Sequence, residues 1–353
     1  MTNLTPQHIN IDEKLLQFRT EVEEFLESKN LISKKEEFLR SKIEPKLDDF
    51  IQDNSFAKDR LKELENMDIS DDEIGEMLQK IKNFLIIQYE IISQRGTKEV
   101  IKLSKQLNDA PSRELVEKAK QILEKNEHIE KEYIIKPVEL KAYLENVFLE
   151  YGLNDWKIEL SEKDITLDDA PNKRILISKN RVFPKGDDKR LAVHEIGVHT
   201  LRCVNGLNQP LKNLGLGVPG YLATEEGLAA LSEELSGCSD YELLRNYAGR
   251  VIAVNSIIKN YSFTQTFELL QSHGFNDNTA WTLSVRAHRG GGYIKDHVYL
   301  KGYYEVKEFY ENGGDLTDLY VGKIALEDLK WAKEMVDKGF LKKPYILPHL
   351  LRK

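Results

Sequence analysis

The segment HEIGVH, residues 194–199, places two histidines five positions apart around Glu195. Histidine nitrogens are common zinc ligands, and a glutamate beside them can serve as a general base. The familiar peptidase motif spaces its histidines four residues apart on one helix face. Five residues turn a regular helix about 140° past a full turn, so His194 and His199 would diverge. We therefore predict a π-type widening near Gly197, where the missing Cβ would ease the distortion.

A regular helix gives HEIGVH a plainer interpretation, in which Glu195 and His199 form an ordinary surface pair at i,i+4. Zinc also requires a third protein ligand, and a catalytic site leaves a fourth position open. The segment TEEGLAALSEEL supplies Glu225 and Glu226 about thirty residues later. Thr224 is expected to be the N-cap of this helix, which places both glutamates in its first turn. Either could be a ligand, or both could simply favour the helix dipole, and periodicity does not decide.

HEIGVH followed by TEEGLA resembles a family named for its QEGLA motif. That family includes bacterial proteins labelled flavohaemoglobin expression modulators and the microtubule-associated tyrosine carboxypeptidases of animals. The likeness also takes in RAHRGGGYIKDHVYLKG (286–302) and LYVGKI (319–324), so it spans roughly residues 137–350. The combined motif is specific, whereas the N-terminal helices match the family only in character.

The resemblance implies one zinc ion per chain, bound by His194, His199 and the glutamate directly before Gly-Leu-Ala, which is Glu226. It gives Glu195 the role of general base. Where family members have glutamine, the neutral amide stands at position 225, so the anionic ligand matches Glu226. This chain departs from that pattern by having Glu225. The extra carboxylate either tunes the site or caps the helix, and capping is the interpretation we favour.

A carboxypeptidase must recognise a terminal carboxylate, which a planar guanidinium binds best. Cations on the histidine helix and around the RGGGY segment are candidates, and nearby tyrosines could donate to an oxyanion. The predicted substrate-binding residues are Arg202, Arg286, Arg289, Lys295 and Tyr299, with Tyr293 as a further donor. Each cation could equally be an ordinary surface charge, and each tyrosine a buried one. The strand-like run RILIS, residues 174–178, could offer an edge for pairing with a peptide.

The elements around these motifs predict an α+β fold that is mostly helical. Residues 11 to about 130 show helical periodicity in successive segments, and we expect an N-terminal helical region over 1–136. A zincin-like metallopeptidase domain with a small sheet is expected over 137–353. It would begin with a helix at 137–151 and strands at 156–160 and 174–178, joined by a polar loop. The histidine helix would follow and end at Asn205–Gly206.

Composition bears on partners and location. The 353 residues carry a net charge of -8, which does not favour a nucleic-acid partner. No run of 18 apolar residues occurs, so no membrane span is expected. The first thirty residues lack the apolar core of a signal peptide. Cys203 and Cys238 cannot make a disulfide framework, and two free thiols suit a cytoplasmic protein.

The leading hypothesis is a zinc-dependent metallopeptidase of the carboxypeptidase type, acting on the C-terminal tail of a peptide or protein. An endopeptidase or aminopeptidase with the same site is a second hypothesis. A non-catalytic zinc-binding regulatory protein is a third, from a different class. The intact Glu195 argues against the third, because a structural zinc site has no need of a general base.

Overall fold

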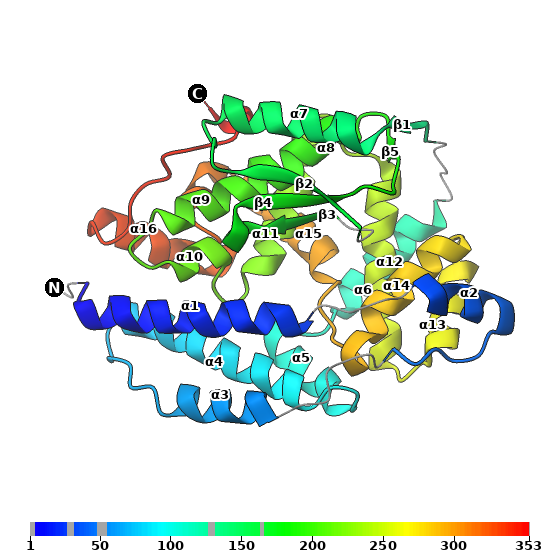
Figure 1. Ribbon diagram of the computed structural model, residues 1–353, viewed down its shortest axis with the longest axis horizontal. Helices are drawn as coiled ribbons and strands as arrows, with labels where there is room; N and C mark the ends of the chain where they lie inside the picture. The colour runs from blue at the N-terminus through cyan, green and yellow to red at the C-terminus, as the bar shows by residue number, and fades with distance from the viewer. Residues whose placement is uncertain (1–3, 27–31, 48–54, 126–130, 163–165, 353) are drawn as a thin grey trace. The chain divides into compact units, whose positions relative to one another are not determined.

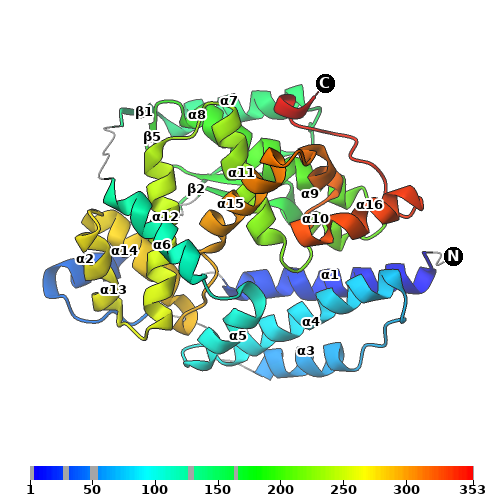
Figure 2. The same ribbon diagram turned by 180° about the vertical axis from the view of Figure 1, so that it is seen from behind.

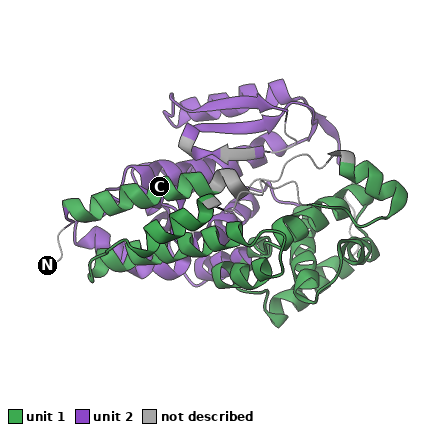
Figure 3. Cartoon of the chain, turned by 60° about the horizontal axis from the view of Figure 1, so that its bottom comes forward, with its two compact units in different colours: residues 1–2, 6–127, 241–301 green, residues 3–5, 128–240, 302–353 purple. Residues whose placement is uncertain are grey.

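The computed structural model describes residues 4–26, 32–47, 55–125, 131–162 and 166–352 (Figure 1). The chain divides into two compact units, coloured separately in Figure 3. Unit 1 comprises residues 1–2, 6–127 and 241–301, and unit 2 comprises residues 3–5, 128–240 and 302–353. The predicted mostly helical class with a small sheet is confirmed. The zincin-like assignment and the domain boundary at residue 136 stay predictions.

Unit 1 is built from helices over its described residues. Its first segment contains α1 (Pro6–Leu26), α2 (Ile32–Ser41), α3 (Ser55–Glu65), α4 (Glu73–Ser93), α5 (Glu99–Asn108) and α6 (Arg113–Glu124). Its second contains α12 (Tyr241–Ile258), α13 (Phe263–Ser272), α14 (Asp277–His288) and the short turn η3 (Arg289–Gly291). Helix α4 contacts α1, α3 and α5, and α6 lies along α12 (Figures 1 and 2).

The local sequence explains the ends of several helices in unit 1. Asp72 caps α4, since its side chain accepts from the backbone N–H groups of Ile74 and Gly75. The apolar residues Phe38, Leu39, Ile43, Leu47 and Phe50 suggest a longer second helix, but α2 ends at Ser41, and residues 48–50 lie outside the described part. Lys42 has a φ of 56°, which a continuing helix cannot accommodate. Helix α3 lies within the predicted helical region, although its own periodicity was not singled out.

Unit 2 contains both sheets found in the described residues. Strands β2 (Lys157–Ser161), β4 (Arg174–Ser178) and β3 (Thr166–Asp169) form one sheet in the order β2-β4-β3. Strands β2 and β4 run parallel, whereas β3 and β4 run antiparallel. Strands β1 (Tyr133–Ile135) and β5 (Phe183–Pro184) make a separate antiparallel pair. Helix α7 (Pro137–Glu150), predicted from its opening proline, contacts β2 and β4.

Two predictions about this sheet are wrong. The segment expected to be a polar loop between the strands contains β3, followed by the turn η1 (Ala170–Asn172). The RILIS strand is β4, and it lies between β2 and β3 rather than at an edge. A central strand has its backbone groups paired on both sides, so β4 offers no edge to a peptide.

The remaining helices of unit 2 surround the two motif segments. A continuous helical stretch consists of α8 (Asp187–Leu191), η2 (Ala192–Thr200) and α9 (Leu201–Leu207), followed by α10 (Asn213–Leu216) and α11 (Tyr221–Leu235). Unit 2 resumes within α15 (Val298–Glu311) and ends with η4 (Leu316–Val321), η5 (Leu326–Asp328), α16 (Leu329–Asp337) and η6 (His349–Leu351). Helix α11 packs against η2. Within the described residues, no helix is both long and apolar enough to cross a membrane.

Candidate metal centre

The helix that carries HEIGVH is widened, as its spacing predicts. Residues Ala192–Thr200 form a π-helix, and the backbone N–H of Leu201 donates to the carbonyl of Ile196, five residues earlier. Because residues five apart are bonded in a π-helix, they lie one above the other. The rings of His194 and His199 are accordingly 4.7 Å apart between centroids, at 90° to each other. The widening covers nine residues, which is longer than the single turn expected.

The space around Gly197 does not require a residue without Cβ. A Cβ built on Gly197 would lie 3.5 Å from the carbonyl oxygen of Ala192 and 3.8 Å from Cβ of Pro348, which are ordinary contacts. The carbonyl of Gly197 instead accepts a hydrogen bond of 2.9 Å from the hydroxyl of Tyr320, a fully buried residue of η4. We infer that this bond satisfies a carbonyl whose α-helical pairing has changed.

His194, His199 and Glu226 converge on one point. Oε2 of Glu226 lies 3.7 Å from Nε2 of His194 and 3.9 Å from Nε2 of His199. One ligand atom from each of the three residues lies within 4.8 Å of the others. A tetrahedral zinc with bonds of about 2.0–2.1 Å separates its ligand atoms by about 3.4 Å. The three side chains therefore fit a zinc ion after a small inward movement.

Each histidine is held from behind by a carboxylate. Nδ1 of His194 is 2.9 Å from Oε1 of Glu233, and Nδ1 of His199 is 2.9 Å from Oε1 of Glu225. An ionised carboxylate only accepts hydrogen bonds, so each Nδ1 must carry the proton and donate it. The lone pair of each ring is then on Nε2, the atom that faces Glu226. This arrangement is typical of histidines that bind a metal.

The carboxylates around His194 and His199 also favour positive charge on these two rings. Burial lowers the pKa of His194, but Glu226 and Glu233 raise it, to about 10. Burial likewise lowers the pKa of His199, whereas Glu225 and Glu226 raise it, and the net shift is upward. The surroundings of both rings thus stabilise a positive charge, which a bound cation could supply in place of protons.

Glu225 does not cap the helix, which was the favoured interpretation, and its contacts agree with the alternative that it acts on the site. Helix α11 begins at Tyr221 with Gly220 as its N-cap, so Thr224 is not the cap and Glu225 lies beyond the first turn. Besides contacting His199, Glu225 pairs with Arg202 and lies 3.1 Å from Nζ of Lys323. Burial raises the pKa of Glu225, but Lys323 and Arg202 lower it by more than burial raises it. The resulting pKa of Glu225 is well below its usual range. Glu225 therefore positions His199 as an ionised carboxylate.

The prediction that Arg202 binds the substrate conflicts with the position of its side chain. Its side chain has no exposed surface. Besides its pairing with Glu225, its Nε donates to the carbonyl of Leu319 at 2.9 Å and its Nη2 to the carbonyl of Ile324 at 2.8 Å. A guanidinium enclosed in this way cannot reach a substrate. Arg202 supports the metal centre instead of binding the peptide.

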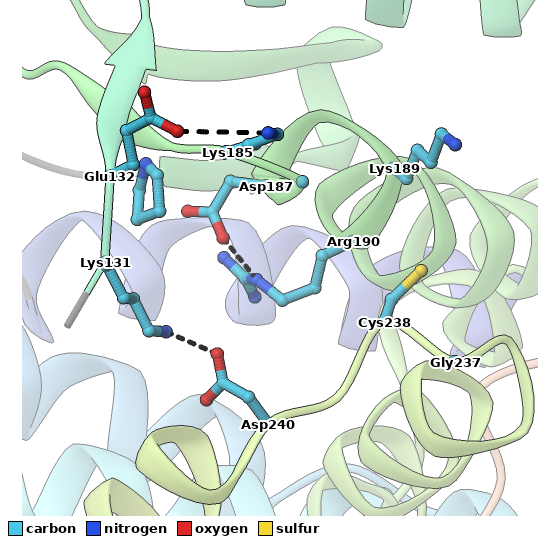
Figure 4. Close-up of a pocket in the computed structure, with 11 residues that line it drawn as sticks. Lys131, Glu132, Lys185, Asp187, Lys189, Arg190, Gly237, Cys238 and Asp240 are labelled. Carbon is cyan, nitrogen blue, oxygen red and sulfur yellow. Dashed lines mark hydrogen bonds and ion pairs between the residues drawn. The ribbon is translucent and has the colours of Figure 1, made fainter. Parts of the chain in front are cut away.

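Glu233 is supported by a second arginine. Nη1 of Arg190 lies 3.1 Å from Oε1 of Glu233, and its Nε donates to Oδ1 of Asp187 at 2.8 Å. Figure 4 shows the pairing of Arg190 with Asp187 at the wall of a pocket of about 420 Å³. Charges of both signs pair around this pocket, as Lys131 does with Asp240 at 2.6 Å. The pocket therefore borders the outer end of the Arg190–Glu233–His194 chain of contacts.

Helical spacing could have identified one of the residues that support the histidines. Glu233 follows Glu226 by seven residues, which is close to two turns and puts both on one face of α11. Lys323 and Tyr320 carried no such signal, because they come from a segment far along the chain. Glu195 is buried, with 8% of its surface exposed, and its charge acts on His194. Its role as general base stays a prediction.

The other predicted substrate-binding residues belong to unit 1. Arg286 donates to both oxygens of Asp296, at 3.0 and 2.7 Å, and Nη2 of Arg289 lies 3.7 Å from Oδ1 of Asp296. The ring of Tyr299 lies 3.7 Å from the guanidinium carbon of Arg250. The assignment of Arg286, Arg289, Lys295 and Tyr299 to substrate binding stays a prediction.

Comparison with known proteins places the whole metal centre inside a single matched region. A family model described as microtubule-associated tyrosine carboxypeptidase matches residues 36–353. The putative tyrosine carboxypeptidase MATCAP2 of Mus musculus is 31% identical over 166 residues, covering 44% of this chain and 31% of that protein. The microtubule-associated tyrosine carboxypeptidase 1 of Rattus norvegicus is 29% identical over 170 residues, covering 45% of this chain and 35% of that protein. The match thus spans about a third of the length of each relative.

Proposed function

The chain belongs to the microtubule-associated tyrosine carboxypeptidase family, and from this premise we propose that it is a zinc-dependent carboxypeptidase. Its reaction is hydrolysis of the last peptide bond of a peptide or protein. The names of the relatives make a C-terminal tyrosine the first residue to test.

One observation carries the zinc-dependent part of this proposal. The two Nε2 atoms of His194 and His199 face Oε2 of Glu226, and both Nδ1 atoms are bonded to carboxylates. Two histidines and one carboxylate leave a fourth tetrahedral position for a reacting group, as catalytic zinc sites do. Zinc bound there would supply Lewis acidity, which makes a water molecule acidic near neutral pH and polarises the scissile carbonyl.

The residues of the chain perform the remaining steps. Glu195 accepts the proton of the attacking water on its carboxylate and passes it to the nitrogen of the departing residue. The C–N bond breaks as the new C–O bond forms. Glu233 and Glu225 keep the two imidazole rings in the tautomer and orientation that present Nε2. Glu195 is nine-tenths buried, which limits the access of other proton donors.

The test combines metal analysis with peptide hydrolysis. Protein purified without added metal is expected to contain about one zinc per chain and to release tyrosine from a peptide that ends in tyrosine. A chelator should stop this release, and added zinc should restore it. Glu195→Gln should retain zinc but lose about 10²-fold or more in turnover. Glu226→Gln should lose zinc, because a neutral amide replaces an anionic ligand.

Glu234→Gln is the matched control, since Glu234 is a neighbouring acid on α11 that pairs with Lys307 instead of the histidines. It should keep both zinc and activity. Zinc far below one per chain with no uptake on titration would refute the metal assignment. Hydrolysis by Glu195→Gln at the parent rate would refute the mechanism. Equal cleavage of the free-acid peptide and its C-terminal amide would indicate an endopeptidase instead.

A further inference from the structure

Unit 1 gathers basic side chains around one buried carboxylate. Asp296 is only 2% exposed, and Arg286 binds both of its oxygens, at 3.0 and 2.7 Å. Arg289 lies 3.7 Å away from the same carboxylate. Burial raises the pKa of Asp296, but Arg286, Arg289, Arg250 and Lys295 lower it, so that it remains ionised. Asp296 therefore lies among several positively charged side chains.

The arginines of this cluster have more hydrogen-bond donors than Asp296 can use. Nε and Nη1 of Arg250 and Nε and Nη2 of Arg289 are buried, and none has a hydrogen-bond partner within the described part of the chain. A buried donor left without an acceptor costs about 1–3 kcal/mol. Four such atoms in one cluster are unusual in a folded protein and call for an additional acceptor.

The cluster is also held in a defined shape. The guanidinium carbon of Arg250 lies 3.7 Å from the ring centroid of Tyr299, and the ring of Tyr247 stacks on Tyr299 at 5.5 Å and 29°. Stacking on an aromatic face fixes the plane of a guanidinium. Arg289 precedes Gly290, whose φ of 64° turns the chain sharply there. The donors are thus oriented before any ligand arrives.

We propose that Arg250, Arg286 and Arg289 form a binding site for a carboxylate group of a peptide, with Asp296 as the resident counter-ion. A planar carboxylate matches the paired donors of a guanidinium, and its two oxygens would accept from the unbonded donors of Arg250 and Arg289. The proposal rests on the proposed function, because a carboxypeptidase takes ligands that carry a free terminal carboxylate. Arg250 is the member that sequence motifs did not suggest.

Peptide binding can be measured separately from hydrolysis. In the full chain carrying Glu195→Gln, a peptide with a free C-terminal carboxylate and its C-terminal amide are compared by calorimetry. The free acid is expected to bind about tenfold or more tightly, the usual effect of hydrogen bonds to a charged group. Arg250→Gln in this background should reduce that ratio towards one. Arg250→Lys keeps the charge but loses the planar fork, and should give an intermediate ratio.

Two further variants distinguish a binding site from a structural cluster. Asp296→Asn removes the competing carboxylate and should increase the preference for the free acid, whereas a purely structural cluster would show only lower stability. Lys259→Gln removes an exposed cation just beyond α12 and should leave the ratio unchanged. Thermal melts identify any variant that fails to fold. The comparison of acid and amide on the Glu195→Gln chain tests the proposal without any of these further substitutions.

Several outcomes would overturn the proposal. These are equal binding of acid and amide, an effect of Lys259→Gln as large as that of Arg250→Gln, or Arg250-dependent binding of inorganic phosphate without binding of the peptide. Failure of the proposed function looks different, because the parent chain would then hydrolyse no peptide even where the free acid binds preferentially. Hydrolysis without any acid preference in binding would refute this inference alone.

Discussion

Two helices of unit 2 build the candidate metal centre in opposite ways. The π-helix η2 abandons regular hydrogen bonding, and this change brings His194 and His199 together. Helix α11 stays α-helical, and its regular spacing puts Glu226 and Glu233 on one face. One helix therefore supplies two candidate ligands by distortion, whereas the other supplies a candidate ligand and one supporting carboxylate by periodicity.

The glycines of these two helices differ in the space around them, and the regular helix is the more crowded of the two. Gly197 in the distorted helix has room for a Cβ, with its nearest contact at 3.5 Å. Gly227 in the regular helix has none, because a Cβ would lie 2.1 Å from the carbonyl oxygen of Gly302 on α15. The comparison teaches that irregular hydrogen bonding and close packing of a helix backbone occur independently. In η2 the constraint comes from hydrogen bonding, and in α11 it comes from packing.

The largest expected effect follows from the crowded contact. Gly302→Ala would place a Cβ 1.7 Å from the carbonyl oxygen of Ala223, so α11 and α15 must separate. Overpacking against backbone cannot be relieved by a rotamer change, and we expect a loss of about 4 kcal/mol or more in unfolding free energy. Denaturant unfolding of the purified variant measures this. Parent-like stability would show that the two helices are not held at this distance.

Glu225→Gln should have the next largest effect. The amide keeps an acceptor for Nδ1 of His199, so zinc should be retained, but Arg202 and Lys323 lose their ionised partner in a buried site. Breaking a buried pair by removing one partner costs about 3–5 kcal/mol, and the remaining amide should hold this near 3. Denaturant unfolding is the measurement.

A second substitution checks the cause of this loss. Lys323→Met in the Glu225→Gln background removes one uncompensated cation and should recover part of the stability. Glu234→Gln serves as the exposed control and should cost less than about 1 kcal/mol, since its pair with Lys307 is partly solvated. No recovery in the double variant would show that charge compensation is not the role of Glu225.

These two cases also show how far the sequence alone could predict the structure. The five-residue spacing of the histidines predicted the widened helix only under the hypothesis that both share an ion, because a regular helix would turn them apart. The choice of Glu226 over Glu225 came from resemblance. Capping was wrongly favoured over an action of Glu225 on the site, because its partner Lys323 lies far along the chain and capping was the nearest local explanation.

The fold was predictable to the same extent. Strand β4 and helix α7 had clear local signals, and both occur where expected. The position of β4 in the centre of its sheet did not follow, since β3 lies in a polar segment without alternation. Pairing with β4 and not local propensity makes that segment a strand, and such override by tertiary context is invisible in a single sequence.

Glu233→Gln tests the support that the regular helix gives to His194. The amide can still accept from Nδ1, but its neutral charge orients and polarises the ring less. Loss of such an outer partner typically weakens metal binding by about 10–100-fold. Competition with a chelating dye measures the zinc dissociation constant. Arg190→Gln, which reaches His194 through Glu233, should give a smaller change. Unaltered affinity in Glu233→Gln would mean that Glu233 does not position the ligand.

The smallest effect is expected in the distorted helix itself, from Gly197→Ala. The new Cβ would meet only ordinary contacts, at 3.5 Å to the carbonyl oxygen of Ala192 and 3.8 Å to Cβ of Pro348. Alanine favours helical conformations by about 1 kcal/mol over glycine, which offsets any small adjustment in a π-helix. We therefore expect unfolding free energy within about 0.5 kcal/mol of the parent and unchanged zinc content. A loss of zinc, or of several kcal/mol, would mean that the widening depends on a residue without Cβ, and that irregular hydrogen bonding and close packing coincide in η2.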